Sequence, residues 1–285
     1  MFTADLLAGK VILITGGGTG LGRSMGERFL QLGAKLAIAG RREDVLREAA
    51  AAMGAGGEEV LPVQCDVRDP AQVTAMIDTV WSHFGTLDVL VNNAAGNFAS
   101  PTERLSHRAV DAVLNIVLHG TFYCTLEVGK RWLAAGRGGV MLNIVTNYAS
   151  SGAGSAYVVP SAAAKAGVLA LTRSLAVEWG DRGIRQVAIA PGPFPTPGAW
   201  DRLMPLPELA QGVTDHIPLG RVGRHEELAN LASYLISDYA GYINGEVITI
   251  DGGEWLQGAG EFSHLRSVTP EQWDDLAKRA RSSKS

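Results

Sequence analysis

Short apolar runs alternate with segments of helical periodicity along most of the chain. The apolar runs cover residues 10–15, 35–40, 60–65, 87–93, 140–145, 184–190 and 246–250. Such uninterrupted runs are expected of parallel strands that are buried on both faces. Because strands and helices alternate throughout, the pattern predicts an α/β fold with one doubly wound parallel sheet. The carboxyl ends of its strands, and any ligand, should lie at one edge of that sheet.

Capping residues mark the start of three helices. Residues 69–72, DPAQ, offer an N-cap aspartate, a proline at the first helical position and a glutamine to close a capping box. Ser106 is placed to cap a long helix that runs to about residue 134. Residues 269–272, TPEQ, have the spacing of cap, first position and box partner again. We therefore expect a C-terminal helical extension beyond the sheet.

The chain shows no internal repeat and no low-complexity linker, so we expect a single domain over residues 1–285. Within it we place the core at about 8–253, a lid at about 191–225 and the C-terminal extension at about 254–285. Residues 191–207 contain half of the chain's twelve prolines. A long irregular connection at the ligand edge of a sheet often forms a lid or a substrate wall.

Composition and charge narrow the class of protein. Hydrophobic residues make up 46% of the chain, the net charge is −4 and the pI is about 5.9. These values predict no nucleic-acid partner and no membrane partner. We see no signal peptide and no apolar stretch of roughly 18 residues, and the two separated cysteines fit a reducing compartment, so we expect a cytoplasmic protein. The six histidines are scattered, and we expect no metal site.

A glycine-rich turn, TGGGTGLG at residues 15–22, follows the first predicted strand and opens a helix. Glycine in this context lets the backbone approach a pyrophosphate at the positive end of the helix. An ordinary glycine-rich turn is the alternative. The candidate cofactor-binding residues here are Gly16, Gly18, Thr19, Gly20, Leu21 and Gly22.

The residues after the second strand indicate which dinucleotide binds. NAD enzymes commonly place a carboxylate there against the ribose 2′-hydroxyl, whereas this chain has Gly40 followed by Arg41 and Arg42. Guanidinium groups can hold a 2′-phosphate by paired hydrogen bonds, which favours NADPH. A solvated helix start is the alternative. Asp66, just past the third strand, can accept a hydrogen bond from the adenine amino group.

The chain resembles the short-chain dehydrogenase/reductase family from about residue 8 to 253. The resemblance rests on TGGGTGLG, NNAAG at 92–96, Asn115, Lys165 and PGP at 191–193, in this order. In that family the lysine binds the nicotinamide ribose and lowers the pKa of a tyrosine four residues before it. We further expect cofactor contacts from Val67, Asn93, Pro191, Gly192, Pro193 and Phe194.

The family's tyrosine is missing from its usual place. Ser161 stands four residues before Lys165, and the two share a helix face. Tyr148 lies thirteen residues before Ser161, about where the common pattern has a serine. The two residue types are exchanged. Tyr157 is a second candidate acid, but it precedes Pro160, which we expect to open the helix, and so need not face Lys165.

This exchange is typical of a subgroup, and the chain resembles the NADPH-dependent 2,4-dienoyl-CoA reductases. The stretches QCDVRDP (64–70), NNAAGNF (92–98), VVPSAAAKAGV (158–168), GEF (260–262) and VTPEQWD (268–274) carry the resemblance. It implies that Tyr148 and Asn97 hold the substrate thioester oxygen. It also implies that Ser161 and Lys165 order the cofactor ribose.

The chemistry of such a reductase tolerates the exchange. Hydride goes to C5 of the conjugated acyl group, and negative charge collects on the thioester oxygen as a dienolate. Hydrogen-bond donors aimed at that oxygen are then required, as in an oxyanion hole. Protonation at carbon follows, from water, and the resemblance implies a 3-enoyl-CoA product in the β-oxidation of unsaturated fatty acids.

The resemblance also implies an acyl-CoA partner and a homotetramer. Positions that match contacts to acyl-CoA are Arg41, Arg68, Phe98, Ser106, Tyr148 and Arg202. Four of these positions have an alternative role that involves no acyl-CoA: Arg68 pairs with Asp69, Phe98 belongs to the core, Ser106 is a helix cap, and Arg202 is a solvated residue of the lid. Two other functions remain open. One is a reductase of another acyl-CoA or of a carbonyl, with Tyr148 or Tyr157 as acid, and the other is a non-catalytic NADP-binding protein.

Overall fold

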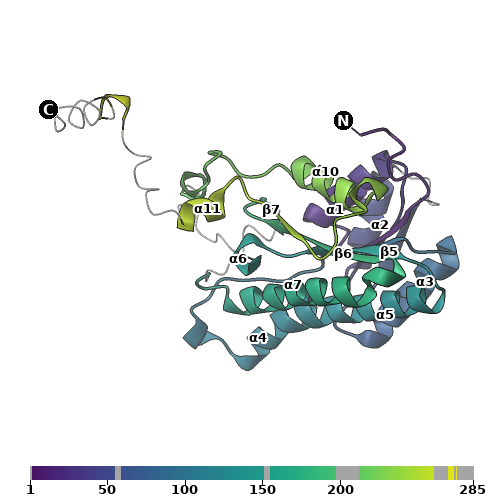
Figure 1. Ribbon diagram of the computed structural model, residues 1–285. Coiled ribbons are helices and arrows are strands. Elements are labelled where there is room, and N and C mark those ends of the chain that lie inside the picture. The colour runs from purple at the N-terminus through teal and green to yellow at the C-terminus, as the bar shows by residue number, and fades with distance from the viewer. Residues whose placement is uncertain are drawn as a thin grey trace.

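The sheet has seven parallel strands in the order β3-β2-β1-β4-β5-β6-β7 (Figure 1). This computed structural model describes residues 2–54, 59–150, 155–196, 212–259, 269–272 and 274. The predicted doubly wound fold is confirmed, and each strand falls on its predicted run to within two residues. The strands are β1 Val11–Thr15, β2 Lys35–Gly40, β3 Val60–Gln64, β4 Val89–Asn92, β5 Gly139–Ile144, β6 Ile184–Pro191 and β7 Val247–Ile250.

Helices cover both faces of this sheet. Its α-helices in the described part are α1 Gly20–Gln31, α2 Glu43–Ala52, α3 Pro70–Phe84, α4 His107–Leu114, α5 Gly120–Ala134, α6 Asn147–Ser150, α7 Val159–Trp179, α10 His225–Ile236 and α11 Glu254–Ala259. Short 3₁₀ turns lie at Thr102–Arg104, Gly180–Arg182, Val213–His216 and Asp238–Ala240. Figure 1 shows α1, α2 and α10 on one face and α3, α5 and α7 on the other.

The side chains of a single strand show how the two faces are filled. Ile12 and Ile14 of β1 join one core cluster with residues of α1, α2 and α10. Val11 and Leu13 of the same strand join a second cluster with residues of α3, α5 and α7. Successive side chains of a strand point to opposite faces, so a continuous apolar run is what a sheet covered on both sides requires.

The predicted helix starts are confirmed, with one correction. The Asp69 carboxylate accepts from the backbone N–H of Ala71 (2.9 Å), and Ser106 Oγ accepts from that of Ala109 (3.2 Å). Gln72 does not close a capping box. Its Oε1 accepts from the backbone N–H of Asp66 (3.0 Å), and its Nε2 donates to the Asp69 carboxylate (3.0 Å). The glutamine therefore fastens the chain leaving β3 to the start of α3.

The long helix predicted after Ser106 is continuous to Ala134, with a π-helical turn at Asn115–His119. By length and composition alone, His107–Ala134 is apolar enough to cross a membrane, which the sequence reading did not foresee. In the structure it lies in the helical layer under the sheet, where Cys124, Val128 and Trp132 are fully buried (Figure 1). A helix that covers a sheet needs an apolar face, although only 33% of this apolar window is buried within the chain.

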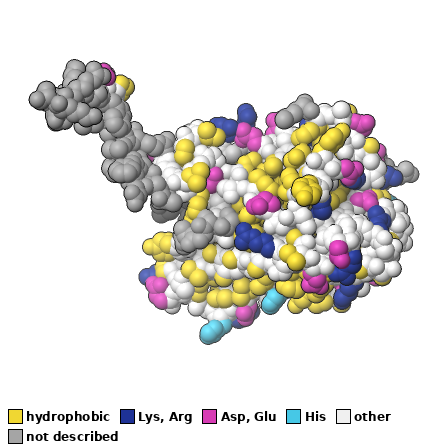
Figure 2. Space-filling model, in the orientation of Figure 1, with side chains coloured by type: hydrophobic (Ala, Val, Ile, Leu, Met, Phe, Trp, Pro, Cys, Tyr) yellow, Lys and Arg dark blue, Asp and Glu magenta, His cyan; other side chains and the backbone are white. Residues whose placement is uncertain are grey.

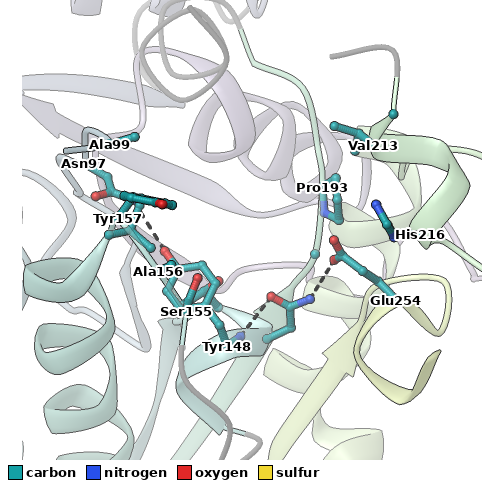
Figure 3. A pocket seen from close by; sticks show the side chains of 15 residues that line it. Asn97, Ala99, Tyr148, Ser155, Ala156, Tyr157, Pro193, Val213, His216 and Glu254 are labelled. Atoms are coloured by element: carbon teal, nitrogen blue, oxygen red, sulfur yellow. Dashed lines mark hydrogen bonds between the residues drawn. The ribbon is translucent and has the colours of Figure 1, made fainter. Parts of the chain in front are cut away.

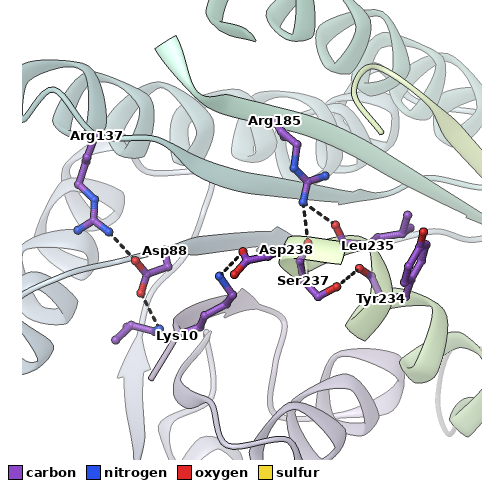
Figure 4. A network of polar contacts seen from close by, with 9 residues as sticks. Lys10, Asp88, Arg137, Arg185, Tyr234, Leu235, Ser237 and Asp238 are labelled. Carbon is purple, nitrogen blue, oxygen red and sulfur yellow. Dashed lines mark hydrogen bonds and ion pairs between the residues drawn. The ribbon is translucent and has the colours of Figure 1, made fainter. Parts of the chain in front are cut away.

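A network of polar contacts lies at the amino ends of the strands, opposite the edge where a ligand is expected (Figure 4). Lys10 donates to Asp238 (2.9 Å), and Asp88 accepts from the backbone of Val11 and pairs with Arg137. Arg185 donates to the carbonyls of Leu235 and Ser237 (2.9 and 3.2 Å). These groups lie at the start of the strands and serve the fold.

The lid and the extension are described only in part. Residues 191–196 and 212–225 of the lid are described, whereas 197–211, with Arg202, lie outside the described residues. In the extension, Thr269 and Gln272 make both hydrogen bonds of the predicted capping box (2.8 and 3.3 Å). The division of the chain into core, lid and extension stays a prediction.

Candidate functional site

Two cavities open at the carboxyl edge of the sheet. One, of about 440 Å³, lies beyond the ends of β1 to β4 and is lined by the glycine turn, Arg41, Arg42, Asp66 and Val67. The other, of about 610 Å³, lies beyond β5 and β6 and is lined by Asn97, Tyr148 and Tyr157 among others. The first sits where the strand order reverses between β1 and β4, which is where doubly wound sheets bind dinucleotides.

The glycine turn is held in a shape that only glycine adopts easily. Gly16 and Gly20 have φ values of 68° and 54°. A Cβ on Gly22 would lie 2.4 Å from the Gly16 carbonyl oxygen, so Gly22 lets α1 close onto the turn. Thr19 is the N-cap of α1 but makes no side-chain cap bond, and Leu21 packs against the core. The first N–H groups of α1 thus remain able to bind an anion such as a pyrophosphate.

Asn93 supports this turn from below. Its Nδ2 donates to the carbonyl oxygens of Thr15 (3.0 Å) and Gly16 (3.2 Å). The Thr15 hydroxyl in turn accepts from the backbone N–H groups of Asn93 and Ala94 (3.0 Å each). The side chain of Asn93 therefore holds the turn in place.

Arg41 and Arg42 are exposed at the end of β2 and line the same cavity. Neither guanidinium makes a hydrogen bond or ion pair within the described part of the chain, so both are available to a phosphate. Arg68 is different. It pairs with Asp66, through Nε at 2.9 Å, and not with Asp69 as one alternative had it. This hydrogen bond holds the pKa of the Asp66 carboxyl below its ordinary value.

Two of the four predicted catalytic residues, Asn97 and Tyr148, line the second cavity, and Tyr148 links them to Ser161. The Tyr148 hydroxyl lies 3.1 Å from Ser161 Oγ and 3.4 Å from Asn97 Nδ2. Ser161 and Lys165 are 3% and 8% exposed, and they lie one turn apart on α7. Lys165 Nζ donates to the carbonyl of Ile144 at the end of β5. Tyr148 stands in α6, just beyond that strand, so the exchange read from the sequence places a phenol beside the serine.

Burial controls the charge of Lys165. The ammonium has lost its hydration in the interior, and this lowers the pKa of Lys165 to about 8. Lys165 can therefore gain or lose its proton at a pH close to neutral. A polyanionic cofactor beside it would favour the charged form.

Tyr157 lies at the mouth of the same cavity. It precedes α7, as predicted, and is 62% exposed. Its φ of 65° is unusual for a bulky residue and marks a tight turn. The backbone carbonyl of Tyr157 accepts a hydrogen bond from the backbone N–H of Ser100 (2.8 Å). This arrangement fastens the loop before α7 to the loop after β4. Its ring is far more open to solvent than Ser161 or Lys165.

Among the residues of this cavity that the sequence analysis missed are Asn147, His216 and Glu254. Figure 3 shows His216 and Glu254 on the side of the cavity across from Asn97 and Tyr157. Glu254 comes just beyond β7, after a glycine pair, and a carboxylate past the end of a parallel strand was the signal available. His216 belongs to a 3₁₀ turn after the proline-rich segment, and nothing in the sequence marks it.

The remaining candidate residues divide between cavity and core. Gly192 and Pro193 line the second cavity, while Pro191 ends β6 and Phe194 packs on the core cluster under α10. Phe98 packs against a cluster formed by α4, α7 and β6, and Ser106 is the cap of α4. Contacts of these two residues with an acyl-CoA stay predictions. No group of His, Cys, Asp and Glu that could hold a metal occurs among the described residues.

Comparison with known proteins identifies the family. The family described as Enoyl-(Acyl carrier protein) reductase matches residues 16–254. A solved short chain dehydrogenase from Bacillus anthracis is 46% identical, with a TM-score of 0.79, over 87% of this chain and 97% of that one. The chain belongs to the short-chain dehydrogenase/reductase family.

Relatives within this family carry more specific names. A "Probable 2,4-dienoyl-CoA reductase" of Bacillus subtilis, named as producing a (2E)-enoyl-CoA, is 45% identical over 87% of this chain and 97% of its own. A "Probable 2,4-dienoyl-CoA reductase 3" of Caenorhabditis elegans, named as producing a (3E)-enoyl-CoA, is 42% identical over 95% and 89%. This short-chain reductase is thus an oxidoreductase that uses a nicotinamide cofactor.

Proposed function

We propose that this short-chain reductase catalyses the NADPH-dependent reduction of a 2,4-dienoyl-CoA to an enoyl-CoA. One observation carries the proposal: the Tyr148 hydroxyl stands between Ser161 Oγ and Asn97 Nδ2, at 3.1 and 3.4 Å. The phenol and the amide can both donate to one substrate oxygen. Two donors converging on one point are what a developing oxyanion requires.

The chain's own residues have separable tasks in this reaction. NADPH, when bound, supplies the hydride that reaches C5 of the acyl chain. Tyr148 and Asn97 then hold the charge that collects on the thioester oxygen. Ser161 and Lys165 orient the nicotinamide ribose from the buried face of α7. Because no alkoxide forms at the carbon that receives hydride, the tyrosine acts as a hydrogen-bond donor and need not give up its proton.

Preference for NADPH is supported by the end of β2. A carboxylate is absent from positions 40–42, and two exposed arginines line the cavity there. Paired hydrogen bonds from guanidinium to a 2′-phosphate are strong and geometrically specific. Asp66 lies in the same cavity, where it can accept from the adenine while Arg68 neutralises it.

The test is a comparison of substrates with the purified full chain. NADPH oxidation should be rapid with 2,4-hexadienoyl-CoA and slow with a 3-ketoacyl-CoA or a simple ketone. Rapid turnover of the ketone alone would instead support a carbonyl reductase. Tight NADPH binding without any turnover would support a non-catalytic NADP-binding protein.

Three further parts of the proposal concern the setting of the enzyme. We propose a role in the β-oxidation of unsaturated fatty acids, a homotetramer as the assembly, and a cytoplasmic location. Sedimentation velocity of the full chain tests the assembly, and fractionation of the source cells tests the location. Arg202 remains a proposed acyl-CoA contact.

A further inference from the structure

The second cavity, which would hold the substrate in the proposed reaction, contains an acidic side chain to which that reaction has assigned no role. Glu254, at the start of α11, lines this cavity together with His216, Gly192 and Tyr148. Its carboxylate lies close under the chain leaving β6, because a Cβ on Gly192 would come within 3.0 Å of Glu254 Oε2. Figure 3 shows the Glu254 and His216 side chains directed into the cavity from the side across from Asn97.

The buried side chain of Asn147 connects Glu254 to the backbone of Tyr148, and it also donates to Asp251 at 3.4 Å. Asn147 is 5% exposed, and its Nδ2 donates to Glu254 Oε2 at 2.8 Å. Its Oδ1 accepts from the backbone N–H of Tyr148 at 2.9 Å. The carboxyl group is thus positioned relative to Tyr148 by hydrogen bonds through one intervening residue, as the dashed lines in Figure 3 show.

The surroundings of Glu254 raise the pKa of its carboxyl group above the ordinary value. Burial raises its pKa, and the nearby Asp251 carboxylate raises it further, while the hydrogen bond from Asn147 and the charge of His216 oppose the shift. The net direction is upward. Asp251 itself accepts from the backbone N–H groups of Gly253 and Trp255, which keeps it as a cap of α11.

We propose that Glu254, in place of the water expected from the sequence, is the acid that protonates Cα of the dienolate. This rests on the proposed function. Hydride adds to C5, the C4–C5 double bond gives its electron pair to the conjugated system, and the negative charge settles on the thioester oxygen. The carbonyl then reforms as Cα takes the proton of the Glu254 carboxyl. Glu254 is left as a carboxylate and is reprotonated from solvent past the exposed His216.

The choice of Cα follows from the positions of the donors. The thioester oxygen is held at Tyr148 and Asn97, and Cα is one bond beyond the carbonyl carbon. Glu254 lines the same cavity as these two donors and is linked through Asn147 to the Tyr148 backbone, so we infer that it faces the carbonyl end of the substrate. C4 lies two bonds further along the acyl chain. Protonation at Cα yields a 3-enoyl-CoA, whereas protonation at C4 would yield a 2-enoyl-CoA.

The test compares wild type with Glu254→Gln, which keeps an oxygen that can accept from Asn147. Single-turnover oxidation of NADPH by 2,4-hexadienoyl-CoA reports hydride transfer, and product formation in D₂O reports protonation. We expect Glu254→Gln to bind NADPH normally, to transfer hydride within about threefold of the wild-type rate, and to release product about a hundredfold more slowly. Glu48→Gln, an exposed change on α2, is the matched control and should behave as wild type.

Two further readouts separate an acid from a merely structural residue. The wild-type turnover number should fall as pH rises through the raised pKa of the Glu254 carboxyl, and this fall should be absent from Glu254→Gln. In His216→Asn the fall should persist, because the Glu254 carboxyl and not the neighbouring imidazole is the acid. This variant also serves as the deciding one if Glu254→Gln does not fold. Deuterium should appear at C2 of the wild-type product.

Each contrary result overturns the proposal in a distinguishable way. If wild type reduces the dienoyl-CoA and Glu254→Gln forms product equally fast with the same pH profile, the acid is elsewhere and the proposed function stands. Deuterium at C4 in place of C2 overturns the proposed site of protonation. If wild type does not oxidise NADPH with the dienoyl-CoA, the proposed function fails and this inference fails with it.

Discussion

The phenol oxygen of Tyr148 lies 3.1 Å from Ser161 Oγ, although the two residues are thirteen positions apart. Tyr148 stands beyond the end of β5, and Ser161 lies in the first turn of α7. The usual family arrangement has these residue types at the opposite positions. The contact shows that exchanging them along the chain still brings a phenol and a serine hydroxyl together, with Lys165 one helical turn further along α7.

Loss of the Tyr148 hydroxyl should abolish most of the activity. Tyr148→Phe removes one donor to the developing oxyanion and little volume, so turnover of a 2,4-dienoyl-CoA should fall by about 10²–10³-fold with NADPH binding intact. Steady-state kinetics and a fluorescence titration measure both quantities. Tyr157→Phe removes a hydroxyl from an exposed residue that lines the same cavity, and it should cost far less activity. If Tyr157→Phe loses more activity than Tyr148→Phe, the donor role belongs to Tyr157.

Arg41 and Arg42 should determine the choice of cofactor. Losing one charge-assisted contact to the 2′-phosphate costs roughly 1.5–3 kcal/mol, or about ten- to a hundredfold in affinity. Arg41→Ala or Arg42→Ala should therefore weaken NADPH binding by that factor and leave NADH binding little changed. Titration of each variant with both cofactors measures this. Arg47→Ala, an exposed arginine one turn further along α2, is the control. Full NADPH preference in both Arg41→Ala and Arg42→Ala would contradict this role.

Lys165 should take up a proton when NADPH binds. Burial lowers the pKa of its ammonium to about 8 in the free protein, and the negative cofactor favours the charged form. The pKa is thus higher in the complex than in the free protein. Proton uptake should then be largest just above pH 8, and NADPH affinity should fall as pH rises through that value.

Calorimetry in two buffers of different ionisation enthalpy measures this uptake. Lys165→Met removes the titrating group and should abolish the difference between the buffers. The variant should also bind NADPH more weakly and turn over more slowly. If Lys165→Met shows the same buffer dependence as wild type, another group titrates on binding.

Gly22 should be needed for the shape of the pyrophosphate turn. In Gly22→Ala the new methyl group would stand 2.4 Å from the Gly16 carbonyl oxygen, which is backbone and cannot move without opening the turn. NADPH binding should weaken by at least tenfold. Gly26→Ala, also buried in α1, is the matched control. Its methyl group would meet only the tips of flexible side chains, with Leu36 Cδ1 nearest at 3.2 Å, so cofactor binding should persist.

The sequence alone determined the architecture and the cofactor edge. Continuous apolar strands require a sheet covered on both faces, and the alternation with helices leaves little choice but a doubly wound order. The glycine turn and the Arg41–Arg42 pair are local features, each set by a few consecutive residues. Even the relation between Ser161 and Lys165 follows from the helical repeat. These inferences needed no knowledge of contacts between distant segments.

Tertiary structure decided which distant side chains meet. Gln72 had the spacing of a capping-box partner, yet the nearby N–H of Asp66 takes its oxygen. Arg68 had acids on both sides of it in the sequence, and the turn after β3 directs it to Asp66. Glu254 and Tyr148 are joined only because β5 and β7 flank β6, so that Asn147 can bridge the ends of non-adjacent strands. The spacing of residues along the chain determines which side chains meet within one helix or turn. Contacts between distant segments are determined by how the helices and strands pack.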